Sequence, residues 1–250
     1  MGHLASVERL RQQQRLEPAF AAQVAAVKAY QHERFRGTYV DMLTDARHAP
    51  AARFFLDELY GPHDFSRRDA QFTRIVPKLV VLFPEPVVRT VRDLARLHDL
   101  SETLDCAMAR QLASAVLDEP TYARAWRQVG MANERSQQIA LAVGIGRDLE
   151  GFTRTPLLLT SLKLMRGPAR AAGLSDLQHF LESGVAAFRH MGGSRHFLNE
   201  IERREQALAQ QLFAAQPDSE SAAITSPAPA AQPGTASGAP SRSDGATGAV

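Results

Sequence analysis

Apolar residues recur at intervals of three and four along almost the whole chain up to residue 213. One such series includes the apolar run 78–83, which by itself resembles a strand: Phe65, Phe72, Ile75, Val76, Leu79 and Phe83. This spacing matches the 3.6-residue turn of an α-helix. No stretch alternates apolar and polar residues for long enough to indicate a half-buried strand with hairpin turns. The pattern therefore predicts an all-α fold.

Prolines, glycines and capping residues divide this pattern into about ten helices. Pro18, Pro50 and Pro86 each suit the first turn of a helix, where the missing backbone N–H costs nothing. The predicted helices cover, approximately, residues 18–43, 50–60, 64–83 (kinked at Pro77), 86–116, 119–129, 132–152, 156–166, 176–191 and 195–213. Because the links between them are short, we expect a mainly antiparallel multi-helix bundle.

The composition of the chain changes at residue 214. Residues 214–250 are mostly Ala, Pro, Ser, Gly and Thr, and they offer almost no apolar side chains to bury. Such a segment cannot offset the entropy lost on ordering. We therefore expect a single helical domain over residues 1–213 and a disordered tail over residues 214–250.

The charge balance argues against two classes of partner. The chain carries 29 Lys and Arg against 27 Asp and Glu. This excess is too small to indicate a nucleic-acid or membrane surface. No run approaches 18 apolar residues, and the first residues lack the apolar segment of a secretory signal. We expect a cytoplasmic protein that binds neither nucleic acid nor membrane.

The single cysteine, Cys106, excludes an intramolecular disulfide and a cysteine-based zinc site. It falls in the middle of the predicted helix 86–116, and no residue nearby in the sequence would activate its thiol. We expect a buried, unreactive side chain.

The predicted helix 86–116 places polar groups on its apolar face. On a helical projection, Ser101 and Asp105 fall among the leucines, His98 lies near the edge of that face, and Glu102 lies just beyond it. A buried carboxylate must find a cation or several donors, because leaving it bare costs several kcal/mol. These four residues therefore define a candidate polar pocket that needs a partner from another helix.

Two interpretations of this pocket remain open. In the functional one, His98 carries a proton or binds a metal ion, with Asp105 or Glu102 beside it. In the structural one, Asp105 is bonded to an arginine and His98 caps a nearby group. We favour the structural network.

Arg68 and Asp69 are the candidate partners from a neighbouring helix. They follow the stiff corner at Gly61-Pro62 and fall near the face that carries Phe65 and Phe72. A partnership of Arg68 or Asp69 with the long helix would satisfy buried groups on both helices. The alternative is a corner with a capped helix start, at which an acid is favoured by the helix dipole.

Three segments carry a resemblance to a known group of proteins. They are FFLDELYGPHDFSRRD (54–69), LHDLSETLD (97–105) and FLESGVAAFRHMGG (180–193). Together they resemble a family of uncharacterised bacterial helical proteins that is classed as a domain of unknown function. The resemblance covers roughly residues 20–213. It implies a single helical domain and a bacterial source, and it implies no activity, cofactor or catalytic residue.

Several further motifs point to structure rather than chemistry. Gly144 and Gly146 imitate a nucleotide-binding fingerprint, but no strand precedes them, so we expect them to allow close helix packing. A di-iron bundle would use two Glu-x-x-His pairs. Asp176-x-x-His179 is a related pair with aspartate in place of glutamate, and no metal site is assigned. His98 could ligate haem with aromatic walls at residues 54, 55 and 72, yet nothing in the sequence specifies haem.

The C-terminal helical hairpin carries two further histidines, His190 and His196, around a Gly-Gly turn. The two histidines could form a metal site, but we favour a structural turn. The expected core residues are Phe188, Met191, Phe197, Leu198 and Ile201. The charged residues expected on a solvated face, with helix-spaced ion pairs, are Glu200, Glu202, Arg203, Arg204 and Glu205.

Taken together, these patterns favour a non-enzymatic regulatory or scaffolding protein that binds a protein partner or a small ligand. The alternative is a metal- or haem-dependent protein or enzyme built around His98, Glu102 and Asp105. The sequence does not decide whether the protein is an enzyme, nor does it indicate an oligomeric state.

Overall fold

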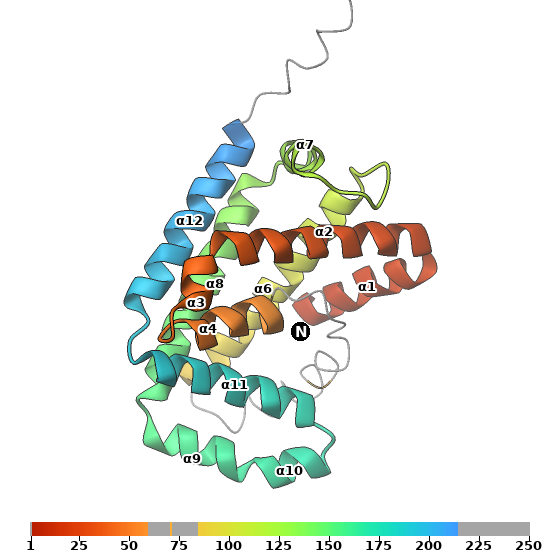
Figure 1. Ribbon diagram of the computed structural model, residues 1–250. Helices are drawn as coiled ribbons and strands as arrows, with labels where there is room; N and C mark the ends of the chain where they lie inside the picture. Colours follow the sequence, from red (N-terminus) through yellow and green to blue (C-terminus); the bar gives the residue numbers. More distant parts are fainter. Residues whose placement is uncertain (1, 60–70, 72–84, 215–250) are drawn as a thin grey trace, which may run out of the picture. The chain divides into compact units, whose positions relative to one another are not determined.

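The computed structural model describes residues 2–59, 71 and 85–214 (Figure 1). Over these residues the chain forms eleven α-helices and one short π-helix, and no strand. The all-α prediction, with about ten helices, is confirmed. The predicted tail, the kink at Pro77 and the corner at Gly61-Pro62 lie outside the described residues, and the domain boundary near residue 213 stays a prediction.

Within residues 2–59 and 119–214, the described helices follow one another with short links. In chain order, the described helices are α1 (Gly2–Leu16), α2 (Pro18–Thr38), α3 (Val40–Thr44), α4 (Ala49–Arg53), the π-helix η1 (Phe54–Leu59), α6 (Glu85–Ala109), α7 (Glu119–Val129), α8 (Ala132–Thr153), α9 (Pro156–Leu164), α10 (Arg166–Ala171), α11 (Ser175–Met191) and α12 (Arg195–Ala214). Within the described residues, no helix is both long and apolar enough to cross a membrane.

Local signals account for most of the helix ends. At the start of α7, Asp118 accepts a hydrogen bond from the backbone N–H of Thr121 at 2.9 Å, as an N-cap residue does. The same helix ends at Gly130, which has a φ of 64°. Gly192, with a φ of 66°, ends α11 in the same way, because only glycine adopts this conformation without strain.

Two helix boundaries differ from the sequence-based expectation. The predicted helix 18–43 is divided at Tyr39, and α6 ends at Ala109 rather than near residue 116. The end of α6 tightens because the N–H groups of Gln111 and Leu112 bond to carbonyls three residues earlier. The helices α1 and α10 were not predicted.

The core consists of two main apolar clusters. The larger one joins α4, η1, α8, α11 and α12 around Phe55, Phe188 and Phe197, each at most 2% exposed. The second joins α2, α6 and α7 around Val27, Met108 and Trp126. All five residues expected in the core of the C-terminal hairpin are buried, which confirms that prediction.

Two central helices, α6 and α8, organise the packing. They contact each other, α1 and α2 pack against α6, and α11 and α12 pack against α8. Figure 1 shows α1 and α2 as neighbouring helices that run in opposite directions. Gly146 confirms the expected close packing, because a Cβ there would lie 2.5 Å from Leu198 Cδ2; Gly144 has open space instead.

Candidate functional site

Four polar side chains of α6, His98, Ser101, Glu102 and Asp105, form what we call the α6 cluster. Glu102 is 4% exposed and Asp105 is 6% exposed. Lys28 of α2 donates a hydrogen bond to Glu102 Oε1. Arg11 Nη2 of α1 lies 4.0 Å from the same oxygen. Two cations from other helices therefore face this buried carboxylate.

The hydrogen-bond partner of Asp105 is a neutral side chain. Gln31 Nε2 of α2 donates to Asp105 Oδ1 at 3.0 Å. The sequence-based hypothesis named Arg68 or Asp69 as the partner, and both lie outside the described residues. Their pairing with the α6 cluster stays a prediction.

The two remaining members of the α6 cluster are half-buried, and each meets a different helix. Arg11 Nη2 donates to His98 Nε2 at 3.3 Å, so Arg11 engages the lone pair that a metal ligand would need. Gln138 of α8 donates to Ser101 Oγ at 2.8 Å. Partners of the α6 cluster thus come from α1, α2 and α8.

The two carboxyls of the α6 cluster have opposite pKa shifts. Burial by itself raises the pKa of Glu102, but the charge of Lys28 and its hydrogen bond outweigh burial, and the pKa lies below its ordinary value. Burial raises the pKa of Asp105 to about 6, because Lys28 acts on it only from a distance and the charge of Glu102 adds to the increase. The environment therefore favours the ionised form of Glu102, whereas burial opposes the ionisation of Asp105.

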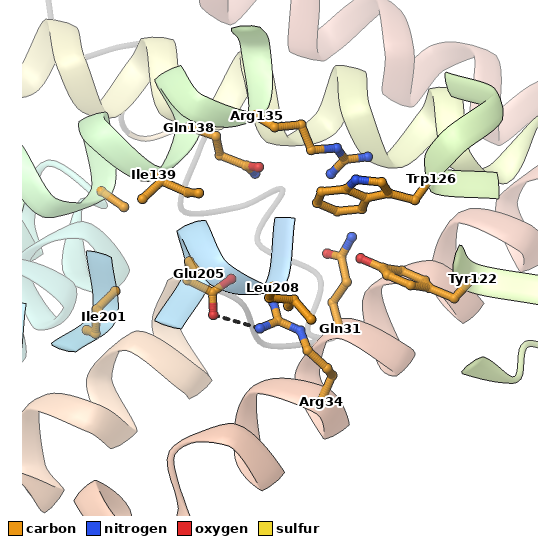
Figure 2. A pocket seen from close by; sticks show the side chains of 11 residues that line it. Gln31, Arg34, Tyr122, Trp126, Arg135, Gln138, Ile139, Ile201, Glu205 and Leu208 are labelled. Carbon is orange, nitrogen blue, oxygen red and sulfur yellow. Dashed lines mark hydrogen bonds and ion pairs between the residues drawn. The ribbon is translucent and has the colours of Figure 1, made fainter. Parts of the chain in front are cut away.

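A cavity of about 40 Å³ lies beside the α6 cluster, among α2, α7, α8 and α12, and we call it the Arg135 cavity (Figure 2). It is lined by Gln31, Arg34, Tyr122, Trp126, Arg135, Gln138, Ile139, Ala142, Ile201, Glu205 and Leu208. The lining contains both polar and apolar side chains. The cavity therefore combines hydrogen-bonding groups with hydrophobic walls, as ligand sites commonly do.

The guanidinium of Arg135 is the most unusual group of this lining. Arg135 is only 3% exposed, and the carbon Cζ of its guanidinium lies 3.4 Å from the ring centroid of Trp126 (Figure 2). Two of its nitrogens, Nε and Nη2, have no hydrogen-bond partner among the described residues, and neither touches solvent. Burial lowers the pKa of Arg135, since the charged form is separated from water. Stacking on indole recovers only part of this cost.

Glu205, the carboxylate of the lining, is already paired. Arg34 Nη1 donates to Glu205 Oε1 at 2.6 Å, and the hydroxyl of Tyr39 donates to the same oxygen at 2.9 Å. The expectation of a solvated face at Glu205 is wrong, because its side chain is 18% exposed and lines the cavity. Glu205 lies four residues after buried Ile201 and so shares the inward face of α12. The expected helix-spaced pairs do occur between Glu200 and Arg203.

One helix links the α6 cluster to the Arg135 cavity. Lys28, Gln31 and Arg34 are spaced three residues apart along α2 and contact Glu102, Asp105 and Glu205 in turn. Gln31 belongs to both regions, because it lines the cavity and donates to Asp105. Gln138 of α8 also belongs to both regions, because it lines the cavity and donates to Ser101.

Sequence reasoning missed Arg135, although a signal was present. Arg135 precedes Ile139 by four residues and Ala142 by seven, so the helical spacing of α8 places it on the buried face. An arginine at an apolar position is a stronger sign of a special environment than a polar residue on a solvated face.

The other candidate groups have ordinary partners. Burial raises the pKa of Cys106 to about 11, in keeping with an unreactive thiol. His190 Nε2 lies 3.0 Å from the carbonyl oxygen of Ala46, and His179 Nε2 lies 3.4 Å from Ser183 Oγ. Phe54 and Phe55 pack with other aromatic rings of the larger core cluster. In the part of the chain that the structure describes, no three His, Cys, Asp or Glu side chains are grouped to hold a metal ion.

These features define an all-helical protein with a partly charged interior and a small polar cavity. Residues 10–219 match the family model described as Domain of unknown function (DUF8198), and the chain belongs to that family. The resemblance to a domain of unknown function is thereby confirmed. No curated protein and no solved structure matches the chain.

Proposed function

We propose that this protein is a non-enzymatic regulatory domain that binds a small ligand in the Arg135 cavity. The observation that carries the proposal is the buried guanidinium of Arg135, which has two unpartnered nitrogens at the edge of a cavity. Leaving charged donors desolvated and unpaired costs free energy. A ligand that completes these bonds recovers that cost, so occupancy of the cavity is favourable.

A regulatory role follows from the way Gln31 joins the two polar regions. The amide of Gln31 donates to Asp105 and lines the cavity. A ligand that contacts this amide changes the environment of a carboxyl whose pKa is about 6. Ligand binding and the protonation of Asp105 are then coupled, and such coupling is reciprocal.

The pairing of the cavity's acid argues against catalysis. A general base takes up a proton from its substrate, and an arginine partner opposes this by favouring the charged form of a carboxylate. Glu205 accepts from Arg34 and from Tyr39 on one oxygen, which holds it as a charge partner. Binding is therefore the function that this lining supports best.

The test is a thermal-unfolding screen with small polar molecules of every charge type, namely neutral amides and polyols, amines and carboxylates. One variant fills the cavity: Ala142→Val adds volume at a residue of the lining that is 4% exposed. Its matched control, Ala140→Val, adds the same volume on the exposed face of α8.

We expect at least one compound to raise the Tm of the wild type and of Ala140→Val but not of Ala142→Val. At a concentration near 100 Kd the gain is about 2.7 kcal/mol, or roughly 5–10 °C for a domain of this size. The proposal is wrong if no compound of any charge type stabilises the wild type, or if every stabilising compound acts equally on Ala142→Val.

A further inference from the structure

The unpartnered nitrogens around the Arg135 cavity are all hydrogen-bond donors. They are Nε and Nη2 of Arg135, Nε1 of Trp126 and Nε of Arg34. Guanidinium and indole groups donate and do not accept. A ligand that satisfies them must therefore supply acceptors, which excludes ammonium compounds and disfavours ligands rich in hydroxyl donors.

The two free nitrogens of Arg135 form a defined geometry. Nε and Nη2 lie on the same edge of a guanidinium, and their N–H groups point in parallel toward two acceptors. Arg166 presents this edge to Glu182, with distances of 2.6 and 2.7 Å to its two oxygens. Arg203 presents it to Glu200 at 3.2 and 2.7 Å. Elsewhere in this protein, the same edge thus binds a carboxylate.

The charges of the lining leave one positive charge without a counterion. Its charged residues are Arg34, Arg135 and Glu205, and Glu205 is paired with Arg34. Asp105 acts on Arg135 only through the field of its charge, because its Oδ1 accepts from Gln31 and no ion pair joins the two residues. A ligand with a single negative charge neutralises the site, whereas a dianion would overcompensate it.

The size and the walls of the cavity restrict the ligand further. One water needs roughly 10–15 Å³ on this scale, so about 40 Å³ accommodates a few waters or one small anion. Ile139, Ala142 and Leu208 provide an apolar side for a short alkyl group. Because the free nitrogens of Arg135 are covered, the guanidinium has to move off the ring of Trp126 to meet a ligand.

We infer that the Arg135 cavity binds a small monocarboxylate, whose two oxygens accept from Nε and Nη2 of Arg135. This inference rests on the proposed function, since it assigns the ligand class of the same cavity. It also predicts a direct optical signal. Trp126 is the single tryptophan of the chain, and it loses its stacked cation when the ligand binds.

The experiment titrates sodium formate, acetate and propionate into the full-length protein and follows tryptophan fluorescence. MOPS, an anion too large for the cavity, keeps the ionic strength constant. Acetamide serves as the neutral match of acetate, and phosphate and chloride as anions of other shape. The variants are Arg135→Met, Arg135→Lys, which keeps the charge but loses the paired donors, and the control Arg124→Met on the exposed face of α7.

We expect saturable binding of at least one monocarboxylate to the wild type and to Arg124→Met. Binding should be at least tenfold weaker in Arg135→Lys and absent in Arg135→Met and in Ala142→Val. The inference is overturned if acetamide, phosphate or chloride binds as well as the carboxylates, if no carboxylate saturates, or if Arg135→Lys binds as the wild type does. Should Arg135→Met fail to fold, Arg135→Lys and Ala142→Val decide the outcome.

The failure of this inference differs from the failure of the proposed function. A neutral or cationic compound that stabilises the wild type but not Ala142→Val would preserve the cavity as a ligand site and overturn the carboxylate. Both would be overturned if no compound stabilises the wild type, or if every stabilising compound acts equally on Ala142→Val.

Discussion

The α6 cluster and the Arg135 cavity both place charges inside the bundle, but they differ in the partners that the chain supplies. Lys28 and Arg11 face Glu102, and Gln31 donates to Asp105. At the cavity, Arg34 pairs with Glu205, whereas Arg135 has an aromatic ring and no anion. The same fold therefore contains one polar region in which cations and an amide of the chain face the buried carboxylates, and one in which a buried guanidinium has no anionic partner among the described residues.

This difference separates a structural role from a binding role. Buried charges that neutralise one another contribute to packing, and removing one of them strands the other. A buried charge without a partner raises the free energy of the empty protein, and a ligand lowers it. Substitutions in the two regions should therefore have different effects on stability, and each prediction below tests that contrast.

The largest effect is expected for Lys28→Met. It leaves Glu102 ionised and 4% exposed without its closest cation. Breaking a fully buried pair costs about 3–5 kcal/mol, and since the side chain of Lys28 is 28% exposed we expect a loss of about 2–4 kcal/mol. Urea unfolding at pH 7.5 measures it, with Lys163→Met on the exposed face of α9 as the control. A loss below about 0.5 kcal/mol would show that Lys28 is no partner of Glu102.

Asp105→Asn should act in the opposite direction. In the wild type, burial holds the pKa of Asp105 at about 6, above its ordinary value of 3.8. The folded state therefore binds this proton more tightly than the unfolded chain, and ionised Asp105 costs stability above pH 6. The asparagine keeps an acceptor for Gln31 without the charge, so we expect a gain of about 1–3 kcal/mol at pH 7.5.

The pH dependence of this gain distinguishes it from a packing effect. As the pH falls from about 7 toward 4, Asp105 takes up its proton and the advantage of Asp105→Asn should vanish. Glu102→Gln provides the contrast, because the pKa of Glu102 is lowered and its substitution should destabilise the protein at pH 7.5. Equal and unchanging effects of the two variants between pH 4 and pH 7.5 would contradict the opposite shifts.

The smallest effect is expected for Arg135→Met in a buffer without small carboxylates. The variant loses a contact with Trp126, worth about 0.5–2 kcal/mol, and removes an unpaired buried charge. These contributions oppose each other, so we expect the free energy of unfolding to change by less than about 1 kcal/mol. A loss as large as that of Lys28→Met would show that Arg135 has a partner within the protein, and the contrast between the two regions would disappear.

The sequence predicted the α6 cluster better than the cavity. Helical spacing alone placed Ser101 and Asp105 among leucines, and the cost of burying a carboxylate predicted that another helix would supply a partner. It could not identify Lys28 or Gln31, which lie 74 residues before Glu102 and Asp105. Such pairs depend on how α2 is placed against α6, and no local pattern contains that information.

The burial of Arg135 and Glu205 was likewise not predicted from the sequence. The spacing of Arg135 to Ile139, and of Glu205 to Ile201, puts each residue on a buried face. Charged residues are nevertheless usually exposed, and a solvated position was wrongly expected for Glu205. Burial of a single side chain is a question of which helix covers it. The packing of α12 against α8 and the contact between Arg135 and Trp126 of α7 decided the two cases.

The sequence by itself determined the all-α fold, several helix ends and the apolar faces, because hydrogen bonds, caps and side-chain spacing act within a few residues of one another. Only the tertiary structure decided which charges pair and which remains without a partner. Ion pairs and cavities depend on the relative positions of whole helices to within an ångström, and the packing of the entire core sets those positions.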